Sequence, residues 1–378
     1  MANGSEDGTR RGATILLSKG LTPGKLRGLQ RISNPNGTLT MLALDQNSSV
    51  IAMAAESLLA RGEARPPNYE EIVEIKLDLM RHLATAASGV LIDAYYGAWS
   101  AIASGSIPPQ TGLLVRFERS GGPKNRAGAP LAFVEPGWSV EKIKLMGADA
   151  VKLLAPFEPT EVGSAEHQFQ LVDHVWSECR RHDILLVLET VSFPFGGEAR
   201  GDASYLERKP RTVIEAARQL SRFCDVYKAE FPGTLGRDDP SRIKDALHAL
   251  DAVCERPWVL LSAAVDYPDY VTQVEMAMEV GATGILGGRA FWKEYFREPD
   301  AASRSHFAAT TARKRVEQVD ALVRSSAVPW YQRYGLTKEE LAGIRAAEGW
   351  HARYASSALR TTVDPRGHSV SDLSNEVY

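Results

Sequence analysis

The sequence predicts an α/β protein, a closed (β/α)8 TIM barrel with a C-terminal helical extension. Short runs rich in Val, Ile and Leu recur eight times, and amphipathic stretches of helical period separate most of them. The apolar character of the runs is nearly continuous, which is typical of parallel strands covered on both faces. An open doubly wound sheet is the alternative. Its nucleotide-binding version is disfavoured, because neither GxGxxG nor GxxxxGK[ST] follows the first run.

Each expected element follows from this pattern. The eight strands are expected at residues 39–45, 89–93, 112–116, 148–152, 184–189, 225–228, 258–262 and 283–287. Helical period predicts helices over residues 69–87, 166–181, 210–223, 241–254 and 268–280. The glycine-rich segment 121–128 after the third strand is expected to be a loop.

The chain divides into a barrel and its additions. Residues 1–20 and 362–378 are rich in small and polar residues and are expected to be flexible tails. The barrel is expected over 21–297 and the C-terminal helices over 298–361, where Thr337 and Glu340 resemble a capping box. These helices either pad the barrel or form the contact of a homo-oligomer.

Composition excludes several classes of function. A formal net charge of −3 gives no reason to expect binding to nucleic acid or to an anionic membrane. Three scattered cysteines are too few for a disulfide framework and suit a reducing compartment. No apolar segment has the length of a signal or transmembrane helix. We therefore expect a cytoplasmic protein.

Polar residues follow nearly every expected strand. In a (β/α)8 barrel the active site lies at the C-terminal ends of the strands. Read in order, those ends carry Asp45 and Gln46, Asp93, Glu118, Lys152, Glu189, Lys228, Ser262, and Gly287, Gly288 and Arg289. One such residue is usually a satisfied structural group, but convergence of so many at one mouth favours an active site.

Two lysines close apolar strands, where an ammonium group is costly to desolvate. Burial among apolar groups and a second nearby cation both lower the pKa of a lysine amine, and a neutral amine attacks a ketone to form a Schiff base. We expect Lys228 to be this nucleophile and Lys152, two strands away, to be the second cation. The alternatives are a surface position for Lys228 and a structural carboxylate partner for Lys152.

A carboxylate and an acid–amide pair complete the predicted chemistry. Glu189 ends five apolar residues, and desolvation is expected to raise the pKa of its carboxyl group, which suits a general acid or base. A salt bridge from Glu189 to one of the lysines is a compatible alternative. Asp45 is expected to orient a lysine or a substrate hydroxyl, and Gln46 to donate or accept hydrogen bonds.

The ends of the last two strands predict an anion site. Small residues there expose backbone N–H groups, and Arg289 supplies a counter-charge, so Ser262, Gly287, Gly288 and Arg289 are expected to bind a phosphate group. A metal is disfavoured, since all eight histidines fall in predicted helices, loops or tails and none follows a strand.

With these residues laid out, the chain resembles the tagatose 1,6-bisphosphate aldolase family of class I aldolases, whose relatives include sulfofructose-phosphate aldolases. The resemblance runs from about Asn36 to Lys293. The most specific segments are Lys228-x-Glu-x-Pro232 and Gly288-Arg-Ala-x-Trp-Lys293. The other segments are Leu42-Ala-Leu-Asp-Gln46, Gly147-Ala-Asp-Ala-Val-Lys-Leu-Leu154, Leu188-Glu189, Lys209-Pro210 and Leu261-Ser-Ala263.

The resemblance implies a Schiff-base aldolase that needs no cofactor. It would cleave tagatose 1,6-bisphosphate, a sugar phosphate, to dihydroxyacetone phosphate and glyceraldehyde 3-phosphate. Lys228 would form the imine and Glu189 would move the proton, with Lys152 and Asp45 as partners. The C1 phosphate would be held by Ser262, Gly288 and Arg289.

One departure concerns the far end of the substrate. The family commonly places a basic residue after Asp-Gln, whereas this chain reads Asn47, Ser48 and Ser49. Segment 193–200 also differs from the usual loop, and Arg200 is a hypothetical replacement for the missing charge. Two alternatives follow: an aldolase for a sulfonated or otherwise modified ketose 1-phosphate, and a non-catalytic sugar-phosphate-binding regulator. Retention of Lys228, Glu189 and Lys152 together argues against the regulator.

Overall fold

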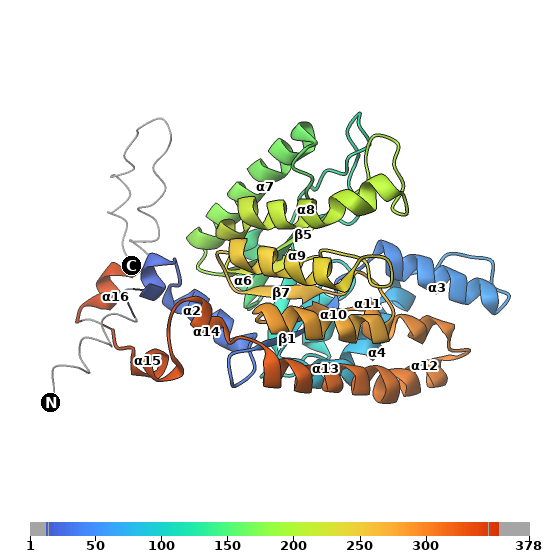
Figure 1. Ribbon diagram of the computed structural model, residues 1–378. Coiled ribbons are helices and arrows are strands. Elements are labelled where there is room, and N and C mark those ends of the chain that lie inside the picture. Colours follow the sequence, from blue (N-terminus) through green and yellow to red (C-terminus); the bar gives the residue numbers. More distant parts are fainter. Residues whose placement is uncertain (1–12, 14, 347, 355–378) are drawn as a thin grey trace.

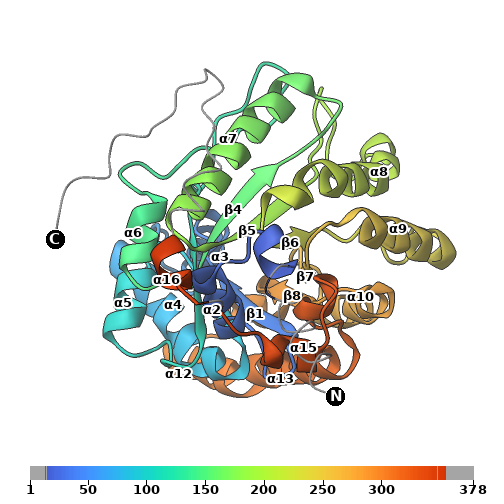
Figure 2. The same ribbon diagram turned by 90° about the vertical axis from the view of Figure 1, so that its left-hand side faces the viewer.

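Eight parallel strands close into a barrel. The structure is a computed structural model, and it describes residue 13 and residues 15–346 and 348–354. The strands are β1 (Leu39–Leu44), β2 (Gly89–Ile92), β3 (Gly112–Arg116), β4 (Ala150–Pro156), β5 (Leu185–Val191), β6 (Val226–Ala229), β7 (Trp258–Leu261) and β8 (Gly284–Gly287). Each pairs with the next in the sequence, and β8 pairs with β1 (Figures 1 and 2). The predicted (β/α)8 barrel is confirmed and the open sheet is wrong.

Helices surround the barrel and fill the connections between its strands (Figure 2). They are α3 (Ser48–Ala60), α4 (Tyr69–Leu83), α5 (Ala98–Ala103), α6 (Val140–Leu145), α7 (Val162–Arg181), α8 (Ala203–Leu220), α9 (Pro240–Val253) and α10 (Tyr267–Val280). The expected start of α8 at Pro210 is wrong, because the helix begins at Ala203 and contains the proline. An interior proline weakens a helix, but Tyr205 and Val213 on either side of Pro210 are both buried.

The sequence alternates along each strand between the inside of the barrel and the helix layer. Leu39, Met41 and Ala43 of β1 belong to the core inside the barrel, whereas Leu42 and Leu44 belong to the core beneath the helices. On β1, β3, β4, β5 and β6 the same period leads from apolar interior residues to an ionisable residue at or just after the C-terminal end of the strand. Polar groups therefore gather at one mouth of the barrel.

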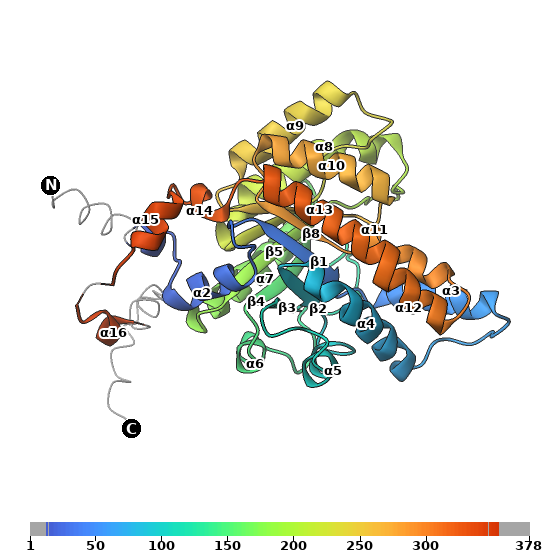
Figure 3. The ribbon, with the colours of Figure 1, turned by 90° about the horizontal axis from the view of Figure 1, so that it is seen from below.

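The opposite mouth is closed by α2 (Pro23–Arg31), as Figures 1 and 3 show at the end away from α3. Lys25 of α2 reaches into this end, where its Nζ lies 2.9 Å from Asp225 Oδ2 and both side chains are 1% exposed. Part of the expected N-terminal tail also packs here, since residues 15–18 are helical and Leu16 is buried. Leu16 belongs to the core inside the barrel.

The helical ring is completed beyond the expected barrel boundary at residue 297. After the short α11 (Arg289–Trp292) and η3 (Lys293–Arg297), the chain forms α12 (Ala301–Phe307), the π-helix η4 (Ala308–Ala312) and α13 (Arg313–Ser326). Val316, Val319 and Val323 of α13 are buried in the core beneath the helices, and α13 packs against both α4 and α10. The barrel therefore extends through α13.

The remaining helices lie beside α2, at the closed end of the barrel (Figure 3). They are α14 (Trp330–Arg333), α15 (Lys338–Gly343) and α16 (Trp350–Arg353). The predicted capping box is confirmed, because Thr337 and Glu340 exchange side-chain and backbone hydrogen bonds at the start of α15. The expected tail 362–378 lies outside the described residues. None of the described helices is long and apolar enough to cross a membrane.

Candidate active site

A cavity of about 400 Å³ opens at the C-terminal ends of the strands, a volume within the usual range for small-molecule sites. Six of the predicted site residues line it: Asp45, Gln46, Lys152, Glu189, Lys228 and Arg289. They come from β1, β4, β5, β6 and β8 or from the residues directly after these strands. The barrel thus brings together side chains that are far apart in the sequence.

Lys152 lies at the centre of a buried cluster of charges. Its Nζ is 3.0 Å from Asp45 Oδ2, 2.8 Å from Glu118 Oε1 and 3.0 Å from Glu189 Oε2. Burial by itself lowers the pKa of this amine, but the three carboxylates outweigh burial and raise the pKa above its usual range. Lys152 is therefore held as an ammonium ion.

Lys228 has a different electrostatic environment. Its Nζ lies 2.9 Å from Glu189 Oε2, the same oxygen that Lys152 contacts. The residue is 3% exposed, so its amine is almost fully removed from bulk water. Lys228 thus shares one carboxylate with Lys152, whereas Lys152 has two further carboxylates to itself among the described residues.

The two flanking acids are held in their ionised forms. Burial raises the pKa of the Glu189 carboxyl, but Lys152 and Lys228 outweigh burial and lower it. Burial acts on Asp45 in the same way, and Lys152, Lys228 and Arg116 lower the pKa of that carboxyl below its usual range. The prediction of a raised pKa for Glu189 is wrong, because the adjacent lysine charges exceed the effect of desolvation.

Two further residues belong to this cluster: Glu118, which stood among the expected polar strand ends without an assigned role, and Arg116, which was not among them. Glu118 bonds to Lys152 through one oxygen and accepts a hydrogen bond from the Leu154 backbone through the other, at 2.9 Å. Arg116 donates to the backbone carbonyl of Asp45. Continuing the alternation of β3 from Leu114 through positions 116 and 118 would have placed both on the inside of the barrel.

The residues expected to bind a phosphate lie at or just after the ends of β7 and β8; Arg289 lines the cavity, whereas Ser262, Gly287 and Gly288 are not among the residues that line it. The Gly288 N–H donates to Ser262 Oγ at 3.2 Å, and a Cβ at Gly288 would lie 2.6 Å from the Ala43 carbonyl oxygen. Ala263 and Ala264 then adopt left-handed backbone conformations, with φ of 44° and 63°, which are strained for residues other than glycine.

The remaining predicted residues of this region differ in what they contact. A Cβ at Gly287 would meet the Tyr270 hydroxyl at 2.6 Å, so this glycine permits close packing against α10. Burial lowers the pKa of Arg289, although an arginine remains charged at neutral pH. The buried Oε1 of Gln46 has no hydrogen-bond partner among the described residues. An unpaired buried acceptor in the wall of a cavity is available to a ligand.

Asp93 follows β2 but does not line the cavity. It is buried, and it pairs with Lys76 of α4, whose Nζ also donates to Asn47 Oδ1 at 2.8 Å. Asn47 in turn donates to Asp93 Oδ1 at 3.3 Å. These three residues connect α4 to the strand ends. Asn47 therefore has a structural role at the position where the family commonly has a basic residue.

Segment 117–139, between β3 and α6, forms one wall of the cavity. Its backbone folds back on itself through a bridge between Glu118 and Val134. The side chain of His167 on α7 contacts the Ala132 carbonyl oxygen at 2.7 Å, which fixes the returning limb of the segment. The tip contacts the loop after β5, because the Gly196 N–H donates to the Ala127 carbonyl at 3.0 Å.

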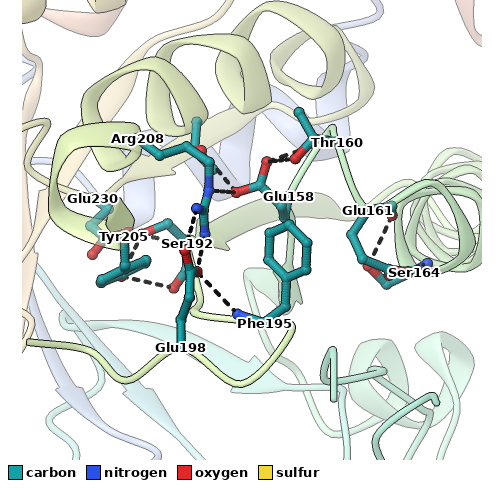
Figure 4. Close-up of polar contacts among 11 residues, drawn as sticks. Glu158, Thr160, Glu161, Ser164, Ser192, Phe195, Glu198, Tyr205, Arg208 and Glu230 are labelled. Atoms are coloured by element: carbon teal, nitrogen blue, oxygen red, sulfur yellow. Dashed lines mark hydrogen bonds and ion pairs between the residues drawn. The ribbon is translucent and has the colours of Figure 1, made fainter. Parts of the chain in front are cut away.

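The loop after β5 is held by Arg208 of α8, whose guanidinium lies between Glu158 and Glu198 (Figure 4). Glu158 is 1% exposed, and its Oε2 is 3.0 Å from Arg208 Nε. Glu198 lies in the loop itself and accepts from both terminal nitrogens of Arg208. Arg200, the hypothetical replacement charge, is exposed in the same loop.

Among the described residues, no three His, Cys, Asp or Glu side chains are grouped so that they could hold a metal ion. The buried carboxylates of the cavity instead surround lysine nitrogens.

Comparison with known proteins identifies the class to which this fold and site belong. Residues 39–294 match the model of the DeoC/LacD family aldolases, and the chain belongs to this family. It is 29% identical over 327 residues to the tagatose 1,6-diphosphate aldolase of Staphylococcus haemolyticus, covering 81% of this chain and 97% of the relative. It is also 29% identical over 333 residues to tagatose 1,6-diphosphate aldolase 2 of Streptococcus agalactiae, covering 83% and 99%.

Solved structures support the fold. The chain resembles an archaeal fructose 1,6-bisphosphate aldolase with a TM-score of 0.51 and 20% identity, covering 80% of this chain and 99% of the other. It resembles the fructose-bisphosphate aldolase of Plasmodium falciparum with a TM-score of 0.61 and 9% identity, covering 81% and 95%.

Proposed function

We propose that this protein is a class I aldolase that cleaves a ketose bisphosphate such as tagatose 1,6-bisphosphate. The products would be dihydroxyacetone phosphate and glyceraldehyde 3-phosphate. Two observations support the proposal: membership of the aldolase family and the unequal surroundings of the two buried lysines. The difference between the two lysines supports the proposed mechanism. Three carboxylates keep the Lys152 amine protonated, whereas Lys228 contacts a single carboxylate, which it shares with Lys152.

In the first half of the reaction, Lys228 is the nucleophile. Glu189 Oε2, at 2.9 Å, accepts the ammonium proton and leaves a free electron pair on Lys228 Nζ. This pair attacks the C2 carbonyl carbon, and the resulting carbinolamine loses water to form an iminium ion. Lys152 remains charged beside the reacting centre and stabilises the developing negative charge on the carbonyl oxygen.

In the second half, Glu189 acts as the base. After returning its proton with the departing water, the carboxylate takes the proton of the C4 hydroxyl. The C4–O bond becomes a carbonyl, the C3–C4 bond breaks, and its electron pair moves toward the iminium nitrogen to give an enamine. Protonation at C3 and hydrolysis then release dihydroxyacetone phosphate and restore Lys228. The iminium group is the electron sink, so the proposed reaction needs no metal.

The substrate is held by the groups around this pair. Arg289, the Ser262 hydroxyl and the Gly288 N–H, once it leaves Ser262 Oγ, would bind the C1 phosphate, and the unpaired Oε1 of Gln46 would accept a hydrogen bond from a substrate hydroxyl. Asp45 would position Lys152 and a hydroxyl of the sugar. We also propose a cytoplasmic location, in line with the small number and scatter of the cysteines.

The proposal is tested by trapping the imine. Protein incubated with dihydroxyacetone phosphate and borohydride is digested, and the reduced adduct is located by peptide mass. We expect the adduct on Lys228, none in Lys228→Ala, and slower formation in Lys152→Ala. A folded wild-type protein that binds the phosphate but forms no adduct on Lys228 would refute the imine mechanism. Loss of activity on adding a chelator would refute metal independence.

A second candidate is an aldolase for a sulfonated or otherwise modified ketose 1-phosphate. The residue at position 47 supports this candidate. The Asn47 side chain is hydrogen-bonded to Lys76 and Asp93, and it supplies no positive charge for a distal phosphate. Comparing kcat/KM for the bisphosphate and for the 6-sulfonate of the same ketose 1-phosphate distinguishes the two.

A further inference from the structure

Arg119 is a cavity residue that the proposed reaction does not use. It follows Glu118 directly, lines the same cavity as Lys228, and is exposed. Its side chain has no ion pair or hydrogen bond in the part of the chain that the structure describes, whereas the neighbouring Arg116 and Glu118 are both engaged. An unpaired guanidinium in the wall of a cavity is available to an anionic ligand.

The charges of the cavity explain which groups are free for a ligand. The buried cations Arg116, Lys152 and Lys228 are balanced by the buried anions Asp45, Glu118 and Glu189. Of the other described residues that line the cavity, the ionisable ones are Arg119 and Arg289. The cavity therefore carries two positive charges beyond its own balance, and both are arginines, which bind oxyanions through paired N–H groups.

The two free arginines lie on different sides of the mouth. Arg289 follows β8 and Arg119 follows β3, so two strands separate their positions around the closed barrel of eight. The lysine pair of β4 and β6 lies on the far side of the ring from β1. A substrate with an oxyanion at each end can therefore contact both arginines and present its middle to Lys228.

The backbone at Arg119 is fixed before any ligand binds. Its N–H donates to the Phe133 carbonyl at 2.7 Å, and the adjacent Ser120 hydroxyl lies 3.0 Å from the Ser48 hydroxyl at the start of α3. Both serines line the cavity with Arg119. Arg119 is therefore anchored at its backbone, and the hydroxyl groups of Ser48 and Ser120, which can donate to an oxyanion, line the same cavity.

We infer that Arg119 determines substrate specificity by binding the oxyanion at the end of the substrate distant from the imine, a phosphate or a sulfonate on C6. The assignment of the two ends rests on the proposed function, in which Arg289 holds the C1 phosphate. Arg119 belongs to the segment that also supplies Glu118, so recognition of the distal group and support of Lys152 come from one connection.

Kinetics of Arg119→Ala test the inference. We expect kcat/KM for the ketose 1,6-bisphosphate to fall by about 10- to 100-fold, mainly through KM, and the loss for the ketose 1-phosphate to be far smaller. Arg119→Lys is expected to fall between wild type and alanine. Arg126→Ala is the matched control, because it removes an exposed arginine from the same segment outside the cavity. Equal losses for both substrates, or none, would overturn the inference.

A binding measurement keeps the inference separate from the proposed chemistry. Hexitol 1,6-bisphosphate and hexitol 1-phosphate lack the ketone and cannot form an imine. Calorimetry is expected to show that wild type prefers the bisphosphate and that Arg119→Ala loses this preference. If Arg119→Ala still binds the bisphosphate more tightly than the monophosphate, the proposed role of Arg119 is refuted, whether or not the imine forms. If Arg119→Ala loses this preference but wild type forms no imine, the role of Arg119 is supported and the aldolase mechanism is refuted. The hexitol 6-sulfonate 1-phosphate identifies which oxyanion is preferred.

Discussion

Glu189 Oε2 contacts the amines of both buried lysines, at 2.9 Å and 3.0 Å. The two lysines differ in the number of acids around them, and the three carboxylates around Lys152 raise the pKa of its amine. Asp45 and Glu118 contact Lys152 and not Lys228 among the described ion pairs. Two lysines a short distance apart thus have unequal electrostatic surroundings, and the different roles proposed for them rest on this inequality.

The charge cluster predicts a specific response to acid. Lys152→Met removes the cation shared by Asp45, Glu118 and Glu189, and we expect the free energy of unfolding at about pH 7 to fall by about 3–5 kcal/mol. The pKa values of Asp45 and Glu189 are lowered in the folded protein, so the unfolded chain takes up protons first as the pH falls. Wild-type stability is therefore complete above about pH 4.5 and decreases below it.

The variant is expected to lose less stability than wild type in the same acid range, since its buried acids are no longer held ionised by Lys152. Urea unfolding followed from about pH 7 to about pH 3 measures the difference. Lys244→Met is the control, because Lys244 is an exposed lysine paired with Glu279 on the surface. A gap between wild type and Lys152→Met that stays constant over this range would contradict the account.

The elements that shape the site are connected by side chains from neighbouring helices. Arg208 extends from α8 to the loop after β5 through Glu198 and to the segment after β4 through Glu158. The guanidinium lowers the pKa of Glu198 to about 2, so the Glu198 carboxyl is ionised at neutral pH. One side chain therefore fixes the two connections that follow β4 and β5.

Arg208→Ala is expected to leave Glu158 without its cation in a site that is 1% exposed. We expect a loss of about 2 kcal/mol in the free energy of unfolding and faster amide exchange in residues 192–202. Arg218→Ala provides the comparison, since Arg218 lies on the same helix and pairs with Glu215 at the surface. Unchanged exchange in the loop would show that its other contacts hold it.

The observed strands and helices show which features the hydrophobic pattern of the sequence predicts and which it does not. The eight strands were predictable because each is a short apolar run between polar turns. The extensions of β4 to Pro156 and β5 to Val191 were not, because they depend on pairing between the two strands rather than on composition. The place of α13 in the helical ring follows from packing against α4 and α10, which its own sequence does not reveal.

Some features of the candidate active site are likewise predictable from the sequence, and others are not. Lys152, Glu189 and Lys228 were recognisable as ionisable residues ending apolar runs, and the cavity contains all three. The lowered pKa of Glu189 could not be predicted, because it depends on how close the lysines of the adjacent strands approach. Arg116 and Glu118 are successive interior residues past the apolar part of β3, and only Glu118 stood among the expected strand ends although Arg116 ends the strand itself.

At the scale of the whole molecule, the two mouths of the barrel hold different groups. The open mouth holds the candidate active site, and the closed mouth holds a separate buried ion pair. Lys25 and Asp225 form a buried ion pair at the closed mouth, where Asp225 Oδ2 also accepts from the Leu186 backbone at 2.8 Å. The interior core of Leu, Val and Met side chains separates this pair from the lysine cluster. The two ends are therefore expected to respond independently to mutation.

Lys25→Met tests this separation. Removing one partner of a buried pair is expected to lower the free energy of unfolding by about 3–5 kcal/mol. The kcat/KM of the folded variant is expected to match that of wild type, unlike that of Lys152→Met. Chemical denaturation and steady-state kinetics on the same preparations provide both values. A selective loss of activity without a loss of stability would show that the two ends are coupled.

The connections at the open mouth differ greatly in length. Between β1 and α3 the chain has only Asp45, Gln46 and Asn47, each committed to the cavity or to the anchoring of α4. Between β3 and α6, residues 117–139 have room for insertions, and they carry Arg119. The short connection is therefore constrained at each position, whereas the long one can vary beyond Arg119 as long as Glu118 keeps its contact with Lys152. We expect insertions in the outer part of the long connection to change which distal group is accepted while Glu118 and the charge cluster around Lys152 are kept.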